Sequence, residues 1–367
     1  MANKKFTSVV KFESCDAAKK LVATMEDYAH HYLNERFGTN YQVVQELGLA
    51  EKAQKINEKY VEELGRRTNQ PFNAFDGEAR DYAKFTNVAE MGVYLNKIML
   101  DVVTPIVIDA SGLSMLAEIH YGGYGDVFEF EMTDRYPYNV SKMGRRQKHT
   151  KTQTKKRNNK TITTDFYGLT TISNLPEILM GDAYIAEDIM LMALGINKKI
   201  YSLVVNAFVT GANAITDSRF VLTNYTETAL LEKLRAGSAY NGAPMVVVGD
   251  AVALKSILPD NTNTRIFLQD EFNTTLGHMS TFNTYKVLSF DVVADEDATD
   301  GVAGLPTDKV YGISLGKGGK LIHVAIGTTD VNTDDIYENS DLSVATTMRK
   351  ELGVALATNQ KVVKCTI

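Results

Sequence analysis

The sequence is poor in the residues that most directly indicate compartment or chemistry. Among its 367 residues are only two cysteines and no tryptophan. Cys15 and Cys365 lie near opposite ends and form no CxxC pair, so we expect free thiols in a reducing compartment. No uninterrupted apolar run approaches the roughly 18 to 20 residues that cross a bilayer, and the N-terminus lacks the apolar core of a secretory signal. These absences predict cytoplasmic synthesis and no membrane partner.

Patterns that mark catalytic, cofactor or metal centres are missing as well. The six histidines are scattered, without HExxH spacing or a partnering cysteine. Residues 312–317 are one residue short of a phosphate-binding loop, and a strand is predicted after them where a helix is needed. The acidic run at residues 291–300 lacks the glycine that a calcium loop requires at its sharp turn. The sequence therefore predicts a protein that is not an enzyme, with no cofactor, no catalytic residue and no metal ligand.

What the sequence does contain is a strong asymmetry of charge. The chain carries 39 basic and 45 acidic side chains, a formal net charge of −6. Nine of the basic residues and no acidic one fall in residues 142–160. They are Lys142, Arg145, Arg146, Lys148, Lys151, Lys155, Lys156, Arg157 and Lys160. The rest of the chain keeps 30 basic against 45 acidic side chains, a net charge of −15, so a basic island sits on an acidic body.

Strand-like segments flank the basic island. Residues 127–132 alternate apolar and polar side chains, and residues 161–166 are rich in β-branched ones, which predicts a long β-hairpin. Its tip has too few apolar side chains to order itself. We rank three interpretations: an arm that docks on the acidic surface of an identical neighbour, a nucleic-acid-binding arm, and a solvated mobile loop. Charge complementarity favours the first, and the lack of aromatic side chains in the tip weighs against the second.

Helical periodicity dominates the first part of the chain and its centre. Helices are predicted at about residues 14–38, 53–64 and 77–103, the last ending before Pro105 because proline disfavours helix in the residue that precedes it. The longest helix is predicted at residues 183–210. Asp182 would cap it, Gly211 would lie just past its end, and Gly195 inside it would mark close packing or a bend.

The remaining segments have patterns that are typical of strands. They are predicted at residues 245–248, 286–290, 310–315, 320–326 and 342–348, with closing segments at 354–357 and 362–367. Asp250 should cap a short helix after the first of these strands. Residues 316–319, Gly-Lys-Gly-Gly, should form a hairpin turn that joins two of them.

This order of elements resembles the major capsid protein of tailed bacteriophages, a fold that encapsulin shells share. The extended loop would be residues 126–164, the spine helix residues 183–210, and the long peripheral strand residues 342–348. Residues 244–250 with the helix after them look like the axial strand–helix element, and residues 349–356 are similar to common capsid-protein endings. The resemblance covers about residues 70–367. It implies an α+β fold with an N-terminal helical arm, an extended β-hairpin loop, a peripheral domain with a long spine helix, and an axial domain.

The resemblance also implies a division of the chain. The ranges are 1–70 for the helical arm, 71–125 for a helix and connection, 126–167 for the extended loop, 168–221 with 331–353 for the peripheral domain, and 222–330 with 354–367 for the axial domain. The first 65 residues would be either an enlarged arm or a built-in scaffolding segment that proteolysis removes. A lysine–asparagine crosslink of the kind some relatives form is not expected, because neither position can be matched.

The function implied is that of a coat protein. It would assemble as pentamers and hexamers into an icosahedral shell around a double-stranded DNA genome, as part of a virion built in the bacterial cytoplasm. Its partners would be its own copies, docked through the nine basic residues, with scaffolding, portal and decoration proteins and non-specific contact with packaged DNA. Two alternatives remain: an encapsulin-type compartment loaded with cargo protein, and a non-assembling nucleic-acid-binding protein that uses the basic arm.

Overall fold

The computed structural model places two sheets and several long helices around one central helix, the longest of those described. It describes residues 16–44, 47–68, 85–111, 113, 117–123, 125–133, 140, 142–143, 157–173, 184–257, 281–290, 292–295, 301–314, 320–338, 344–357 and 360–367. The long helices are α1 (Asp16–Phe37), α2 (Leu49–Thr68), α3 (Phe85–Ala110) and α5 (Ile185–Asn213). The predicted α+β class is confirmed.

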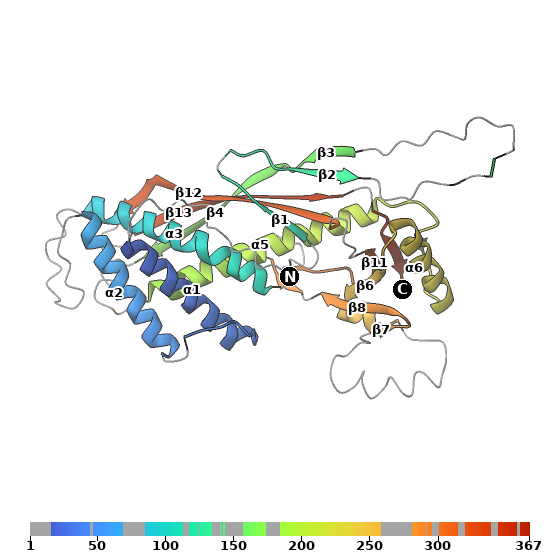
Figure 1. The fold of residues 1–367 in the computed structure, drawn as a ribbon, viewed down its shortest axis with the longest axis horizontal. Coiled ribbons are helices and arrows are strands. Elements are labelled where there is room, and N and C mark those ends of the chain that lie inside the picture. Colours follow the sequence, from blue (N-terminus) through green and yellow to red (C-terminus); the bar gives the residue numbers. More distant parts are fainter. Residues whose placement is uncertain are drawn as a thin grey trace.

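Helices α1 and α2, which form the predicted N-terminal arm, pack into the main core. They pack beside α3 and the first half of α5 (Figure 1). Their apolar stripes meet in one buried cluster, here called the helical core. It includes Leu21, Met25, Ile56, Tyr60, Leu64, Leu95, Met99, Val103, Ile189 and Met190. Helix α1 ends at Phe37, and Gly38, the predicted stop, follows it with a φ of 64°, a left-handed conformation that glycine adopts without strain.

The prediction that the third helix ends before Pro105 is wrong, because α3 continues through this residue to Ala110. Proline removes one backbone hydrogen bond, but Val103 and Val107 on either side are buried in the helical core, and this packing holds the helix together. By length and composition alone, Met91–Ala110 could also cross a membrane, with a mean hydropathy of 1.5. It is not an uninterrupted apolar run, since Lys97, Asp101 and Asp109 lie within it. Burial in the core accounts for its apolar character.

Among the described residues the first sheet has four strands, in the order β1 (Ala117–Tyr121), β12 (Ile322–Glu338), β13 (Val344–Leu356) and β4 (Thr164–Ser173). β1 runs parallel to β12, whereas β13 runs antiparallel to both β12 and β4. Helices α3 and α5 lie on one face, here the inner face (Figure 1). The segment predicted at 354–357 is largely the end of β13, not a strand of its own. The proposed domain boundaries after residues 330 and 353 fall inside β12 and β13, and the division into domains stays a prediction.

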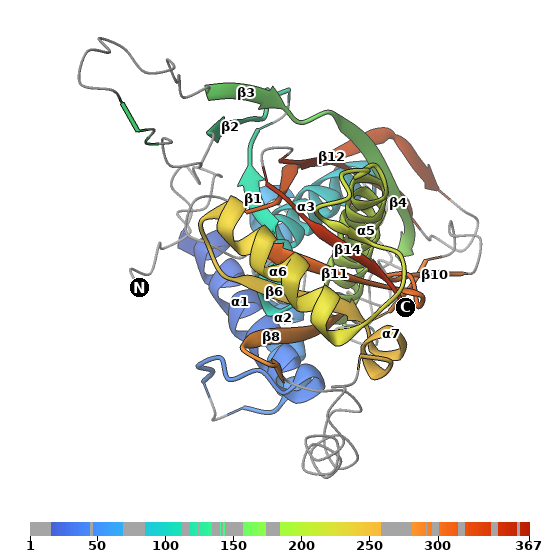
Figure 2. The same ribbon diagram turned by 90° about the vertical axis from the view of Figure 1, so that its right-hand side faces the viewer.

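The second sheet, which has six strands in the described part of the chain, lies toward the C-terminal end of α5. Its order is β5 (Val221–Leu222), β14 (Val363–Thr366), β11 (Lys309–Ser314), β6 (Met245–Asp250), β8 (Tyr285–Phe290) and β7 (Thr281–Phe282). Helix α6 (Glu227–Asn241) crosses this sheet, with the short α7 (Ala251–Lys255) beside it (Figure 2). The small pair β9 (Val293–Ala294) and β10 (Val302–Ala303) contacts α5. Asp250 caps α7 by accepting a hydrogen bond from the backbone of Val252, as predicted.

The predicted hairpin between residues 310–315 and 320–326 is wrong. β11 pairs with β6 and β14 in the second sheet, whereas β12 pairs with β1 and β13 in the first. The chain therefore passes from one sheet to the other between two strands that are close in sequence. Residues 316–319, the predicted turn, lie outside the described part of the chain.

The structure around α5 differs from what was predicted for two of its glycines, Gly211 and Gly195. Gly211 lies inside the helix, which continues to Asn213. A Cβ atom there would lie 2.2 Å from a methyl carbon of Leu356, so this glycine lets the helix approach β13 closely. Gly195 has no such neighbour within 4 Å, so the first of its two predicted roles, close packing, is absent, and the second, a bend, stays a prediction. Tyr184 occupies the N-cap without a side-chain bond, and the predicted cap Asp182 lies outside the described residues.

Candidate assembly surface

The predicted extended hairpin is present where the structure describes it. Strand β2 (Glu129–Thr133) pairs antiparallel with β3 (Arg157–Thr161), with Glu129 opposite Thr161 and Thr133 opposite Arg157. An isolated pair of strands is marginally stable in water, so this hairpin needs support. The outer face of the first sheet supplies it, as Figure 1 shows β2 and β3 lying over β12 and β13. There Phe128, Phe130 and Ile162 pack on Ala325, Ala355 and Ala357.

Gly353 determines how the chain passes from the hairpin to the sheet. Residues 162–163 connect β3 to the edge strand β4, and Gly353 of β13 lies opposite Thr164. A Cβ atom on Gly353 would lie only 2.4 Å from the backbone oxygen of Thr163. The connection therefore crosses directly over β13 at a position that any side chain would block. Sequence reasoning missed this residue, although small side chains at 353, 355 and 357 alternate with larger ones and could have indicated a close contact.

Three of the nine predicted basic residues lie in the described part of the chain. Lys142 is exposed, and Arg157 begins β3. Lys160 donates a hydrogen bond from its ammonium nitrogen to the backbone oxygen of Leu356, at 3.1 Å. It thereby ties β3 to the end of β13 within the subunit. The other six, Arg145, Arg146, Lys148, Lys151, Lys155 and Lys156, lie outside the described residues, so the docking role of the set stays a prediction.

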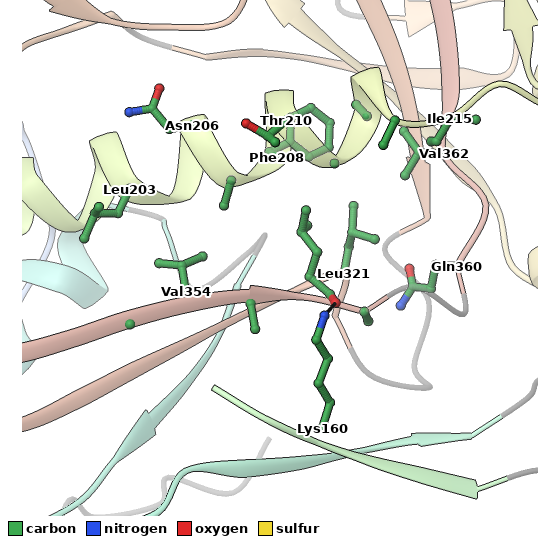
Figure 3. Close-up of a pocket in the computed structure, with 18 of the residues that line it drawn as sticks. Lys160, Leu203, Asn206, Phe208, Thr210, Ile215, Leu321, Val354, Gln360 and Val362 are labelled. Atoms are coloured by element: carbon green, nitrogen blue, oxygen red, sulfur yellow. Dashed lines mark hydrogen bonds between the residues drawn. The ribbon is translucent and has the colours of Figure 1, made fainter. Parts of the chain in front are cut away.

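Beside the hairpin base is a groove of about 970 Å³. Figure 3 shows it between the second half of α5, which contributes Leu203 and Phe208, and the end of β13, where Val354 lies. Lys160 borders it from the hairpin, with its bond to the β13 backbone drawn. The described residues that line the groove are mostly apolar or hydroxyl-bearing and include no histidine or cysteine.

The first sheet ends in a long edge strand. β4 is ten residues long and pairs with β13 on one side. Within the described ranges no strand pairs with its other side. Phe166 in this strand is 55% exposed, although it is a large apolar side chain. A long edge strand is a template for pairing with another chain, so β4 offers a surface for a partner.

A polar cluster lies on the outer face of the sheet, close to the hairpin. His120 of β1 and His323 of β12 hydrogen-bond through Nε2 and Nδ1, at 3.1 Å. The ring of Phe130 from the hairpin stacks on His323, with centroids 3.8 Å apart. Burial is the main cause that lowers the pKa of His323 to about 4, and the nearby carboxylate of Glu118 opposes that shift. Sequence reasoning did not bring these residues together.

Comparisons with known proteins return structures but no sequence relatives. No family model matches the chain. No curated protein matches it either. The structure is similar to the capsid of a native GTA particle, with 13% identity and a TM-score of 0.44, covering 70% of this chain and 90% of that one. It is also similar to the mature capsid of bacteriophage PhiM1, with 10% identity and a TM-score of 0.41, covering 68% and 85%.

A third similar structure is a virus-like particle from Pyrococcus furiosus, with 13% identity and a TM-score of 0.41, covering 74% of this chain and 99% of that one. These are capsids and a virus-like particle, the class of protein that the order of elements in the sequence resembles.

Proposed function

We propose that this chain is the subunit of a closed shell, the major capsid protein of a tailed phage. The observation that carries the proposal is the hairpin β2–β3. Its described base rests on the body through a small apolar cluster, and the basic segment continues from it. A two-stranded element of this kind gains stability when a second surface packs against it. We assign that surface to the acidic body of a neighbouring copy.

The edge strand β4 supports the same proposal. A ten-residue edge and an exposed Phe166 are features that monomeric proteins usually cover. In a shell, each subunit meets its neighbours through heterologous contacts that closed symmetry repeats around a ring. We therefore place β4 and the hairpin base in subunit interfaces. We propose that the subunits form pentamers and hexamers, and that these close into a shell around a double-stranded DNA genome. Assembly would take place in the bacterial cytoplasm, with scaffolding, portal and decoration proteins as further partners.

The N-terminal helices have a definite place in this proposal. The buried side chains of α1 and α2 complete the helical core together with α3 and α5. Removing them would expose an apolar surface formed by side chains such as Leu95, Met99 and Ile189, which would destabilise the subunit. We infer that both helices remain in the assembled wall. A cleavable scaffolding segment would have to be another protein or another part of the chain.

Removal of the hairpin tip tests the proposal directly. Because Thr133 and Arg157 are opposite each other, residues 134–156 can be replaced by Asn-Gly, which forms a tight two-residue turn. The base, with its apolar cluster, is kept. We expect this variant to fold and to sediment as a single subunit, while the full chain forms particles that negative-stain electron microscopy detects. Normal particles from the shortened variant would contradict the proposal.

A charge-reversal variant tests the electrostatic part. Lys155, Lys156 and Arg157 are each replaced by Glu, and assembly should be lost or misdirected. The matched control replaces three basic residues that are exposed on helices, Lys20, Lys55 and Arg235, by Glu as well. The net charge of the chain then changes by the same amount. Normal particles from the first variant, or equal loss in both, would refute docking through the basic hairpin.

The full chain also separates the alternatives. Sedimentation near its own mass of 40.6 kDa at micromolar concentration would rule out a shell and leave the nucleic-acid-binding protein. Particles that contain cargo protein and no nucleic acid would identify an encapsulin-type compartment. Particles with packaged DNA would agree with the phage capsid.

A further inference from the structure

The pairing of β1 with β12 gathers three potential metal ligands on one face of the first sheet. The two strands are parallel, with Glu118 opposite His323. Side chains alternate between the faces of a strand, so Glu118 and His120 share a face. Their neighbours Ile119 and Val324 pack toward α5 and the second sheet instead. The outer face therefore carries two imidazoles and one carboxylate within a few residues of an exposed sheet edge.

The ligand atoms are already close together. Nε2 of His120 lies 3.1 Å from Nδ1 of His323. A carboxylate oxygen of Glu118 lies 3.8 Å from the same Nδ1. Each of the three residues offers a nitrogen or oxygen atom, and all three atoms lie within 4.8 Å of one another. In a tetrahedral zinc site with bonds of about 2.0–2.1 Å, ligand atoms are about 3.4 Å apart, so small side-chain rotations would complete the site.

We propose that Glu118, His120 and His323 bind a divalent transition-metal ion of the zinc class. Two histidines and a glutamate are a ligand set that zinc adopts, and imidazole suits zinc, copper and nickel better than magnesium or calcium. Unlike an exposed acidic cluster, this site has an aromatic side chain packed against one of its ligands. Phe130 stacks on His323 at an interplanar angle of 14° and shields one side of it.

The other side of the site is open. The side chain of Glu118 is 47% exposed, so water can occupy the remaining coordination position. The ion would join the short edge strand β1 to β12 directly beneath the hairpin base. Metal binding would then hold together the surface on which Phe130 rests, and binding to the folded state alone would raise its stability. Metal binding at these three residues does not require that the protein forms a shell.

Titration of the full-length protein tests the site. The protein is treated with EDTA, dialysed, and titrated at pH 7.5 with zinc chloride by calorimetry, and with Co²⁺ by visible absorption, which reports tetrahedral ligation. We expect one ion per chain and a higher melting temperature with zinc. His120→Ala should weaken binding by at least about 100-fold, since even loss of supporting groups around a metal ligand costs 10–100-fold.

The matched control is His31→Ala. His31 lies 3.2 Å from Glu35 on α1, and among the described residues this pair belongs to no group of three possible ligands. The substitution removes an imidazole from the pair, so zinc binding should not change. If His120→Ala does not fold, Glu118→Gln on the exposed side takes its place. Less than one ion per chain, or a Glu118 or His120 variant that binds as tightly as the unmodified protein, would overturn the proposal.

Discussion

A buried ion pair that fastens α3 to the first sheet gives a quantitative test of the fold. The ammonium nitrogen of Lys350 lies 3.1 Å from a carboxylate oxygen of Asp101, and the side chains are only 6% and 11% exposed. The backbone N–H of Thr329 donates to the same oxygen, at 3.1 Å. The register of β12 against β13 shifts between Ile326 and Thr329, so this N–H follows an irregularity in the ladder and finds its acceptor on the helix.

Asp101→Ala should destabilise the subunit by about 3–5 kcal/mol, because it leaves the Lys350 ammonium buried without its counter-charge. Burial already lowers the pKa of Lys350, and besides Asp101 its ammonium donates to the neutral hydroxyl of Thr329, at 3.2 Å. The loss is measured by urea denaturation of the variant that lacks the hairpin tip, so that assembly does not contribute. Asp101→Asn keeps an acceptor for Thr329 and should cost less.

The double variant Asp101→Leu/Lys350→Met is the decisive control. It removes both charges and keeps apolar volume, so it should cost much less than Asp101→Ala alone, with about 1 kcal/mol remaining for the unpaired N–H of Thr329. The coupling energy between the two positions should then exceed about 1.5 kcal/mol. Additive effects, or a loss below about 1 kcal/mol for Asp101→Ala, would refute the claim that this pair holds α3 on the sheet.

Three further changes have expected outcomes of their own. Gly353→Ala should displace the hairpin base and reduce particle yield in electron micrographs, because its Cβ would collide with the backbone oxygen of Thr163; normal yield would contradict the close crossing. Gly195→Ala should be neutral or raise stability by up to about 1 kcal/mol in urea, since nothing lies within 4 Å, and a clear loss would show an unrecognised constraint. Hydrogen bonds from Arg66 lower the pKa of Glu63 from 4.5, so its stabilisation is present above that pH and is lost as pH falls. Glu63→Gln should therefore cost more at pH 7 than at pH 3, and equal costs would refute this.

Sequence reasoning succeeded where a signal is complete within one turn or strand. The helix end at Gly38 and the Asp250 cap depend on a few neighbouring residues, and both were predicted correctly. The alternation at residues 127–132 likewise located a strand of the hairpin. Pro105 and Gly211 were misread because tertiary packing overrides their usual breaking effect. Local pattern cannot show which core lies beside a helix.

Local sequence pattern predicts even less about the candidate sites, because their residues come from segments far apart in the chain. His120 and His323 are 203 positions apart in sequence, and only the parallel pairing of β1 with β12 brings them together. Neither has a spacing that marks a metal ligand. The crossing at Gly353 depends equally on a contact between segments far apart in the chain. By contrast, the basic segment is contiguous, so its existence could be read from composition, whereas its partner surface could not.

Helix α5 has a consequence for how the subunit opens. Ile185 to Ala193 contribute to the helical core, whereas Ile200 to Ala212 contribute to the core between the two sheets. Ile196, between these stretches, packs against both. The helix cannot unwind at its centre without loosening two cores at once, so the halves of the subunit should not open independently. Backbone amides near Ile196 should accordingly exchange with solvent deuterium only through global unfolding, and they should be among the slowest in the chain.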